Sequence, residues 1–136
     1  MSIIEFTPDQ DFCQLYHTIF PEVTNKNGIF GQNAKWYGIK LEGGTIIAFC
    51  TIGIIDPHKI FVYNVGVNQP YREQGYGKQL MDYIIELYNM CDIYLFVKKN
   101  NHKAIRLYQK CHFGFAHRAF VPPMGEICME HNHISS

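Results

Sequence analysis

Residues 67–80 read VNQPYREQGYGKQL and separate two segments with different hydrophobic periods. The segment before them, Ile60 to Val67, is rich in β-branched and aromatic residues and predicts a strand. After them, apolar side chains recur at intervals of three and four residues, which predicts an amphipathic helix over about 75–90. These apolar residues are Leu80, Met81, Ile84, Ile85 and Tyr88. The quoted stretch therefore predicts a turn from the end of a strand into the start of a helix.

This turn contains the pattern RxxGxG, from Arg72 to Gly77. Glycines let a ligand approach the backbone closely, and a helix N-terminus carries about half a positive charge. Arg72 and Lys78 add formal positive charge on either side. These features predict a pyrophosphate site, although tight strand-to-helix turns also use Gly for steric reasons alone. The spacings of the Walker loop and of the dinucleotide-binding GxGxxG are both missing, which indicates another phosphate carrier.

A second helix is predicted to begin at Asn101, a residue type that suits the N-cap position. Ala104, Leu107, Tyr108 and Cys111 follow at helical spacing, and positions 101, 104 and 108 share one face. Between the two helices, 93–97 is a short apolar strand. The result is a β-α-β unit with one parallel step, and ligands bind such units at the carboxyl end of the first strand.

The remaining segments complete an α/β fold with one mixed, mostly antiparallel sheet of about seven strands, flanked by helices. A helix is expected to begin with Thr7 as N-cap, Pro8 at the first helical position and Asp9 in an acidic first turn, and to run to Phe20, followed by a loop over 22–33. Gly43-Gly44 suits a two-residue hairpin turn. A frayed tail is expected from His131 to Ser136. The further strands are predicted over 2–6, 35–42, 45–55, 113–121 and 127–130.

Length and composition limit the function classes. The 136 residues, 47% of them hydrophobic, fit a single domain over 1–136. Twelve basic and twelve acidic residues balance, so we expect no nucleic-acid or membrane partner. The N-terminal residues resemble no signal peptide, and the five cysteines contain no CxxC pair, which favours reduced thiols in the cytoplasm. The sequence is compatible with a homodimer.

Residues 67–80 resemble the acetyl-CoA signature of the GNAT superfamily of acetyl-CoA-dependent N-acetyltransferases. That signature has a strand ending in Val, a Tyr-Arg pair, and [QR]xxGx[GA] opening a helix. Residues 101–108, NHKAIRLY, resemble the second signature of the superfamily, NxxAxxLY. Both motifs occur in the expected order, and the resemblance extends over nearly the whole chain. It implies the GNAT fold and transfer of an acetyl group from acetyl-CoA to an amine, with no metal.

The resemblance also implies a role for each motif residue. The backbone of 65–67 would pair with the pantetheine arm as an added strand, and Asn101 would bond to pantetheine. Arg72 and the loop amides would hold the pyrophosphate. Tyr108 would be the general acid for the departing thiolate, although a core aromatic on an amphipathic helix is the alternative. The predicted coenzyme-binding residues are Val65, Gly66, Val67, Arg72, Glu73, Gln74, Gly75, Tyr76, Gly77, Lys78, Asn101, Ala104, Leu107 and Tyr108.

Two positions depart from the family pattern. The second motif commonly continues to a Gly-Phe pair, where this chain has His112-Phe113 followed by Gly114-Phe115. Either His112 replaces the Gly, or the turn carries a two-residue insertion. Many members also have a Glu on the fourth strand that deprotonates the amine, where this chain has Tyr63 and Asn64. The general base is therefore unassigned, with His58, Asp56 and, as a weaker choice, Tyr63 as candidates.

The acceptor is the least specified part. In this fold its groove would involve residues 25–36 and 120–124, whose Phe30, Trp36, Tyr37 and Phe120 favour an aromatic-walled site for a small-molecule amine. A protein N-terminus or lysine is the second choice, and a catalytically inactive acyl-CoA-binding module is the third.

Two cysteine-based roles are the weakest hypotheses. Cys111 is a weak candidate for an acyl carrier. Cys128, His131 and His133 have ligand types for zinc but lack a partner pair at finger spacing.

Overall fold

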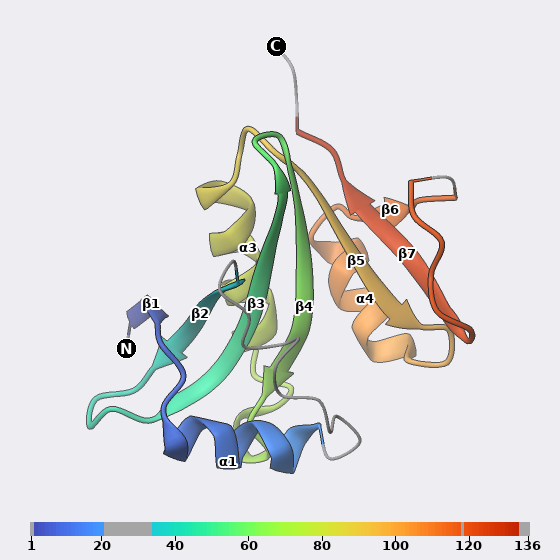
Figure 1. Ribbon diagram of the computed structural model, residues 1–136. Helices are drawn as coiled ribbons and strands as arrows, with labels where there is room; N and C mark the ends of the chain where they lie inside the picture. Colours follow the sequence, from blue (N-terminus) through green and yellow to red (C-terminus); the bar gives the residue numbers. More distant parts are fainter. Residues whose placement is uncertain (1, 21–33, 118, 134–136) are drawn as a thin grey trace.

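The computed structural model describes residues 2–20, 34–117 and 119–133. Seven strands form one sheet in the order β1-β2-β3-β4-β5-β7-β6, and only the β4–β5 pair is parallel (Figure 1). This confirms the predicted α/β class and the mixed sheet. The elements are β1 (Ser2–Phe6), α1 (Gln10–Ile19), β2 (Ala34–Lys40), β3 (Ile46–Asp56), β4 (Lys59–Val67), η1 (Gln69–Tyr71), α3 (Tyr76–Leu87), β5 (Asp92–Lys98), α4 (His102–Lys110), β6 (Gly114–Phe115) and β7 (Glu126–His131).

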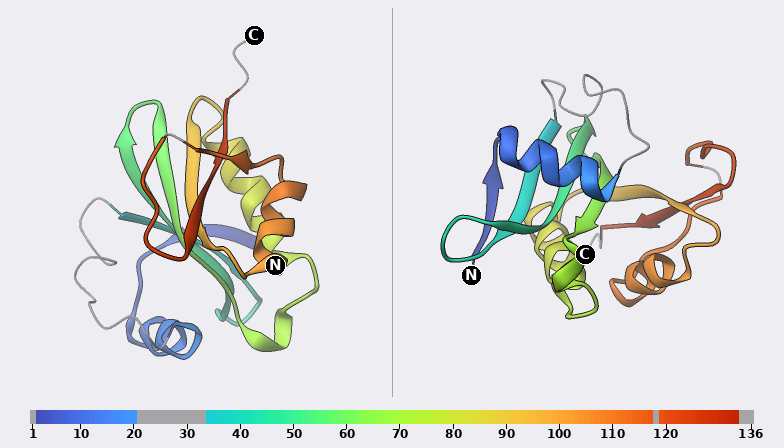
Figure 2. Two further views of the ribbon diagram at one scale, coloured as in Figure 1. Left: turned by 90° about the vertical axis from the view of Figure 1, so that its right-hand side faces the viewer. Right: turned by 90° about the horizontal axis from the view of Figure 1, so that it is seen from below.

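Helices cover both faces of the sheet. Helix α1 lies on one face, and α3 and α4 lie on the other (Figure 2). Successive strand residues alternate between these faces, so Trp36 packs with Phe12 and Tyr16 under α1 while Tyr37 packs in the larger cluster under α3. Leu80, Met81 and Ile84 of α3 are fully buried there. Each such side chain contributes about 1.5–3 kcal/mol of hydrophobic stabilisation.

Local signals set the helix starts, although α1 begins two residues later than predicted, with Asp9 in place of Thr7 as its N-cap. The Asp9 carboxylate accepts a hydrogen bond from Phe12 N–H at 2.8 Å and caps α1, and Asn101 accepts one from Ala104 N–H at 3.2 Å and caps α4. Helix α3 begins after Gly75, whose φ of 87° lies in the left-handed region that favours glycine. It ends at Leu87 rather than near Met90, because the Tyr88 carbonyl turns back to accept from Cys91 N–H at 2.9 Å.

Strand β4 carries an irregularity at the position where it separates from β5. Its register against β3 shifts between the pairs Thr51–Tyr63 and Phe49–Gly66, and Asn64 has a φ of 55°. The shift leaves one more residue on β4 than on β3, which is a β-bulge. The parallel pairing with β5 stops at Val62–Leu95, although both strands continue (Figure 1). Within the described part of the chain, residues 63–67 therefore have no strand partner on the β5 side.

The end of α4 resolves the departure from the family motif. His112 has a φ of 70°, and its N–H donates to Gln109 O at 3.0 Å while Phe113 N–H donates to Tyr108 O at 2.9 Å. These two bonds form a Schellman motif with His112 at the left-handed position that favours glycine. His112 thus replaces the Gly of the motif, and no insertion is needed. Phe113 then enters the core, buried to 4% exposure.

The predicted strand over 113–121 is wrong in length. Only Gly114 and Phe115 pair with β7, and one further bond runs from Ala116 N–H to Cys128 O at 2.9 Å. Pro122 and Pro123 lie in the connection that follows, where proline supplies no N–H to continue a ladder. The strand therefore gives way to a loop that leads into β7.

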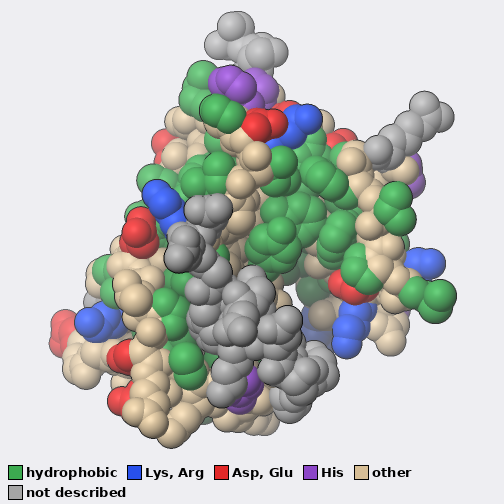
Figure 3. All heavy atoms as spheres, viewed as in Figure 1, with side chains coloured by type: hydrophobic (Ala, Val, Ile, Leu, Met, Phe, Trp, Pro, Cys, Tyr) green, Lys and Arg blue, Asp and Glu red, His purple; other side chains and the backbone are tan. Residues whose placement is uncertain are grey.

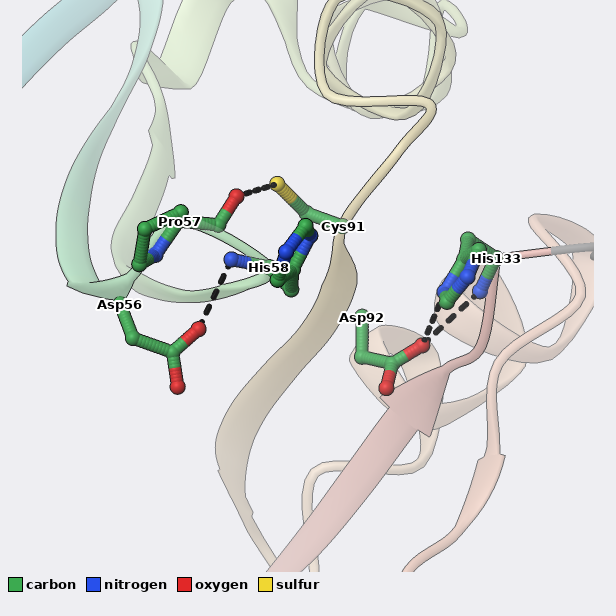
Figure 4. A network of polar contacts seen from close by, with 6 residues as sticks. All are labelled: Asp56, Pro57, His58, Cys91, Asp92 and His133. Carbon is green, nitrogen blue, oxygen red and sulfur yellow. Dashed lines mark hydrogen bonds and ion pairs between the residues drawn. The ribbon is translucent and has the colours of Figure 1, made fainter.

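The predicted fraying from His131 is also wrong for residues 131–133. His131 is the last residue of β7 and pairs with Ile93. One Asp92 oxygen accepts a bond from His133 N–H at 3.0 Å and lies 2.9 Å from its Nδ1 (Figure 4). These contacts join the segment after β7 to the start of β5. Residues 134–136 are outside the described part.

Candidate active site

A cavity of about 750 Å³ lies beside the carboxyl end of β4. It is lined by β4, the loop that follows, the start of α3 and the first turns of α4. The structure thus brings the two sequence motifs together around one space. All of the predicted coenzyme-binding residues line it except Gln74 and Tyr108. Sequence reasoning did not name five further lining residues, which are Ile19, Phe20, Gln69, Tyr71 and Lys103.

The loop between β4 and α3 is held by its own side chains. Arg72 donates from Nε to the Val67 carbonyl at 2.9 Å, and Gln74 donates from Nε2 to the Pro70 carbonyl at 3.0 Å. The Gln74 side chain therefore stabilises the loop and points away from the cavity. A Cβ at Gly75 would meet no atom within 4 Å, so its backbone faces open space. The loop combines exposed N–H groups with the positive start of α3, which suits a bound anion.

Gly77 is needed for the packing of two helices. The sequence pattern alone does not distinguish this role from making room for a ligand. A Cβ at this position would lie 3.2 Å from Leu107 Cδ2 on α4 and 3.9 Å from Val67 Cγ2. Gly77 therefore lets α3 and α4 come together at the cavity. Of the two motif glycines, only Gly75 has a positive φ.

The charged residues that line the cavity, as far as the structure describes the chain, are the cations Arg72, Lys78 and Lys103 and the carboxylate Glu73. Lys78 Nζ lies 2.7 Å from Asp82 Oδ2, and Lys103 Nζ lies 2.6 Å from Glu73 Oε1. The hydrogen bond from Lys103 and its charge hold the pKa of Glu73 below its ordinary value. Glu73 is therefore ionised at neutral pH, next to the predicted pyrophosphate site.

Tyr108 lies in the core next to the cavity. Its side chain is 7% exposed and packs in the same apolar cluster as Val65, Val67 and Leu107. Burial raises the pKa of its phenol, with smaller contributions from the Cys50 and Cys111 thiols. The hydroxyl therefore stays protonated well above neutral pH and acts as a donor. Within the described residues it forms no hydrogen bond, so a ligand could use it.

Cys111 does not have the properties of a nucleophile. Burial raises the pKa of its thiol to about 11, so its thiolate is scarce at neutral pH. The side chain is 1% exposed and packs in the main core. A structural role accounts for it.

The two polar candidates for the general base are too far away. Asp56 Oδ1 accepts from His58 N–H at 2.8 Å in the turn that joins β3 to β4 (Figure 4). That turn precedes β4, whereas the cavity lies at its other end, about 25 Å along the strand at 3.3 Å per residue. Tyr63 is nearer, but burial raises the pKa of its phenol, so the group stays protonated at neutral pH and cannot accept the proton of the amine.

The zinc hypothesis also conflicts with the placement of its residues. Cys128 and His131 are three residues apart on β7, so they point to opposite faces of the sheet. Cys128 packs with Phe61 and Tyr94, whereas the His131 ring lies 5.5 Å from that of Phe113. Among residues 2–20, 34–117 and 119–133 there is no group of three or more potential ligands.

The predicted acceptor residues are only partly brought together. Trp36 and Tyr37 are buried on opposite faces of β2, so they do not form a common wall. Phe30 and the rest of 25–33 lie outside the described residues. Phe120 joins an aromatic surface that we define as Phe61, Tyr63, Phe96 and Phe120, with centroid distances to Phe61 of 4.8, 4.7 and 5.7 Å. Hydrophobic side chains gather there over β4, β5 and β7 (Figure 3).

Comparisons with known proteins agree with this site. Residues 4–113 match the sequence model of the Acetyltransferase (GNAT) family. A search of curated proteins finds no match. Within the described part of the chain, no helix is long and apolar enough to cross a membrane.

Several solved structures have the same fold. An acetyltransferase of Bacillus subtilis in complex with CoA superimposes with a TM-score of 0.78 at 16% identity, covering 97% of this chain and 98% of that one. A GNAT acetyltransferase of Elizabethkingia anophelis with acetyl-CoA bound gives 0.75 at 16%, covering 96% and 97%. The ribosomal-protein-S18-alanine N-acetyltransferase of Escherichia coli gives 0.74 at 18%, covering 99% and 97%. With its two motifs gathered at one cavity and more than half of its length matched, this chain belongs to the GNAT acetyltransferase family.

Proposed function

We propose that this protein transfers the acetyl group of acetyl-CoA to a primary amine, by direct attack of the amine in a ternary complex. The observation that carries the proposal is the cavity of about 750 Å³ that joins the two sequence motifs. Family membership and the CoA and acetyl-CoA complexes of structural neighbours support it.

The residues present fit acetyl-CoA. The loop amides, Arg72 and the start of α3 suit the pyrophosphate, because together they offer N–H groups and positive charge. The β5 side of residues 63–67 has no strand partner, so it can pair with the amides of the pantetheine arm. Asn101 uses Oδ1 to cap α4, which leaves its side-chain N–H₂ for the same arm. When bound, acetyl-CoA supplies an activated acyl thioester.

The chain's own contribution is to orient the reactants and to manage protons. Two bonds change: the amine nitrogen bonds to the acyl carbon, and the bond from that carbon to sulfur breaks. Tyr108 would give its hydroxyl proton, or a hydrogen bond, to the departing sulfur. A backbone N–H of 65–67 would stabilise the charge on the carbonyl oxygen. Because none of the three candidate bases fits, we propose that the amine loses one proton to solvent before it attacks. The second proton leaves the nitrogen as the amide forms, and solvent returns a proton to Tyr108 if its hydroxyl proton has gone to sulfur.

The aromatic surface favours an acceptor that is a small molecule with an apolar body. Its Phe61 and Tyr63 rings lie on β4, the strand whose carboxyl end forms the cavity, and Tyr63 remains 44% exposed. The second candidate acceptor is a protein N-terminus. It is supported by the likeness to the enzyme that acetylates an alanine of ribosomal protein S18.

Thiol release from acetyl-CoA tests the proposal when a panel of apolar amines, polyamines and short peptides is offered. We expect release that depends on the amine, together with saturable CoA binding by calorimetry. Binding without release for any amine would identify an acyl-CoA-binding module instead. Absence of both would refute the proposal.

A further inference from the structure

Among the described residues, every cation that lines the cavity has a partner within the protein. Arg72 bonds to the Val67 carbonyl, Lys78 pairs with Asp82, and Lys103 pairs with Glu73. Val67 is five positions from Arg72 in the sequence, and Asp82 is four positions from Lys78. The Glu73–Lys103 pair is different, because its residues are 30 positions apart and join the loop before α3 to the first turn of α4.

Glu73 is an unusual residue for its position. It has a φ of 63°, a left-handed conformation that favours glycine, and non-glycine residues in that region concentrate at functional sites. Of the cavity-lining residues that the structure describes, it is also the one carboxylate. A carboxylate there repels a phosphate unless its charge is already compensated. Lys103 supplies that compensation at 2.6 Å.

The pair can be exchanged at little cost. The two side chains are 78% and 72% exposed, and ion pairs at such exposure add little stability. A phosphate monoester carries close to two negative charges at neutral pH and attracts an ammonium group more strongly than a carboxylate does. A phosphate that reaches Lys103 would therefore displace Glu73.

We propose that Lys103 binds the 3′-phosphate of coenzyme A, and that Glu73 occupies Lys103 until this phosphate displaces it. This inference rests on the proposed function. Coenzyme A has a pyrophosphate and one separate phosphate monoester, on the ribose. The pyrophosphate suits the loop amides and the start of α3, whereas Lys103 lies on α4, across the same cavity. Only a ligand that carries the monoester has to displace Glu73 from Lys103. Glu73 therefore lowers the affinity for coenzyme A more than it lowers the affinity for a ligand without the monoester.

Calorimetry with coenzyme A and with 3′-dephospho-coenzyme A tests the assignment. In a Glu73→Gln background, where no uncompensated carboxylate is left beside the phosphates, Lys103→Met should weaken coenzyme A binding about 5- to 30-fold and change dephospho-coenzyme A binding less than about twofold, as expected for one lost charge-assisted contact. Lys110→Met, which removes an exposed lysine at the other end of α4, is the matched control and should change neither. Thermal melts establish that both variants are folded.

Glu73→Gln tests the displacement. It should tighten coenzyme A binding about two- to fivefold at low salt, and less at about 0.5 M salt, where the Debye length falls below about 5 Å. The gain should be confined to coenzyme A, because dephospho-coenzyme A has no monoester to compete with Glu73 for Lys103. An equal gain for both ligands would reduce Glu73 to simple repulsion and overturn the exchange.

Other outcomes overturn the proposal in distinct ways. If Lys103→Met weakens both ligands equally, Lys103 contacts the pyrophosphate; if it weakens neither, it contacts no phosphate. If Glu73→Gln weakens binding, the pair organises the loop instead of competing with the ligand. If the wild-type protein binds neither ligand, the proposed function itself fails.

Discussion

Replacing Tyr108 by Phe removes one hydroxyl from an otherwise unchanged ring. The ring is 7% exposed and lies 5.9 Å from that of Phe113, and these packing contacts stay. Because the hydroxyl has no hydrogen-bond partner among the described residues, the change leaves no group there unsatisfied, and stability should change by less than about 1 kcal/mol. A hydrogen bond to a charged group contributes about 1.5–3 kcal/mol, and about 1.4 kcal/mol corresponds to a factor of ten in rate. We therefore expect kcat to fall about 10- to 150-fold.

The assay is single-turnover thiol release, with coenzyme A affinity measured on the same preparation. The affinity should stay within about threefold, because the proton is needed only as sulfur departs. Tyr83→Phe is the matched control, since Tyr83 lies on α3 and does not line the cavity. An unchanged kcat in the Tyr108 variant would show that Tyr108 is a packing residue. A collapse of coenzyme A affinity would place its hydroxyl in the binding step instead.

Three further results are expected. Gly75→Ala forces a φ of 87° on a residue with a Cβ, so it should weaken coenzyme A binding in a folded protein; unchanged affinity by calorimetry would contradict the anion-loop interpretation. His112→Gly relieves a left-handed residue and should raise the free energy of unfolding by about 0.5–1 kcal/mol in urea titrations, whereas a loss would contradict the Schellman assignment. The kcat/KM for the amine should rise about tenfold per pH unit from pH 7 to 9, because the free amine increases below its pKa near 10.4. Burial raises the pKa of Tyr108 and keeps this donor protonated there, so a falling limb below about pH 9 would contradict its role.

The elements that sequence predicted well are those with local physical signals. Asn101 caps the helix it was expected to cap, and Gly43 and Gly44 both have the positive φ that the hairpin required. The start of α1 was predicted to within two residues, with Asp9 as the cap in place of Thr7. The loop there is longer than two residues, since Leu41 N–H donates to Thr45 O at 2.9 Å. Hydrophobic periodicity also separated the helical segments from the strands.

The predictions that failed depended on long-range placement. The alternation of β2 puts Trp36 and Tyr37 on opposite faces of the sheet, which excludes a shared wall, although period-two reasoning could have shown this from sequence. His58 looked suitable by residue type, but a turn at the start of β4 cannot reach the cavity at its end. Lys103 lies within the second motif, and only its pairing with Glu73 across the cavity distinguishes it from a solvated lysine.

The proposed coenzyme site is built mainly from two short sequence segments, whereas the proposed acceptor site combines residues that are far apart in the sequence. Apart from Ile19 and Phe20 at the end of α1, the cavity is lined by one segment, 65–78, and by the start of α4, 101–107, so two short motifs are enough to predict its position. The aromatic surface instead combines Phe61 and Tyr63 of β4, Phe96 of β5 and Phe120 of the loop before β7. No spacing rule connects these positions, because the bulge at Asn64 and the parting of β4 from β5 determine which side chains meet. Acceptor specificity can thus change through single substitutions on separate strands, while the coenzyme site requires its two segments together.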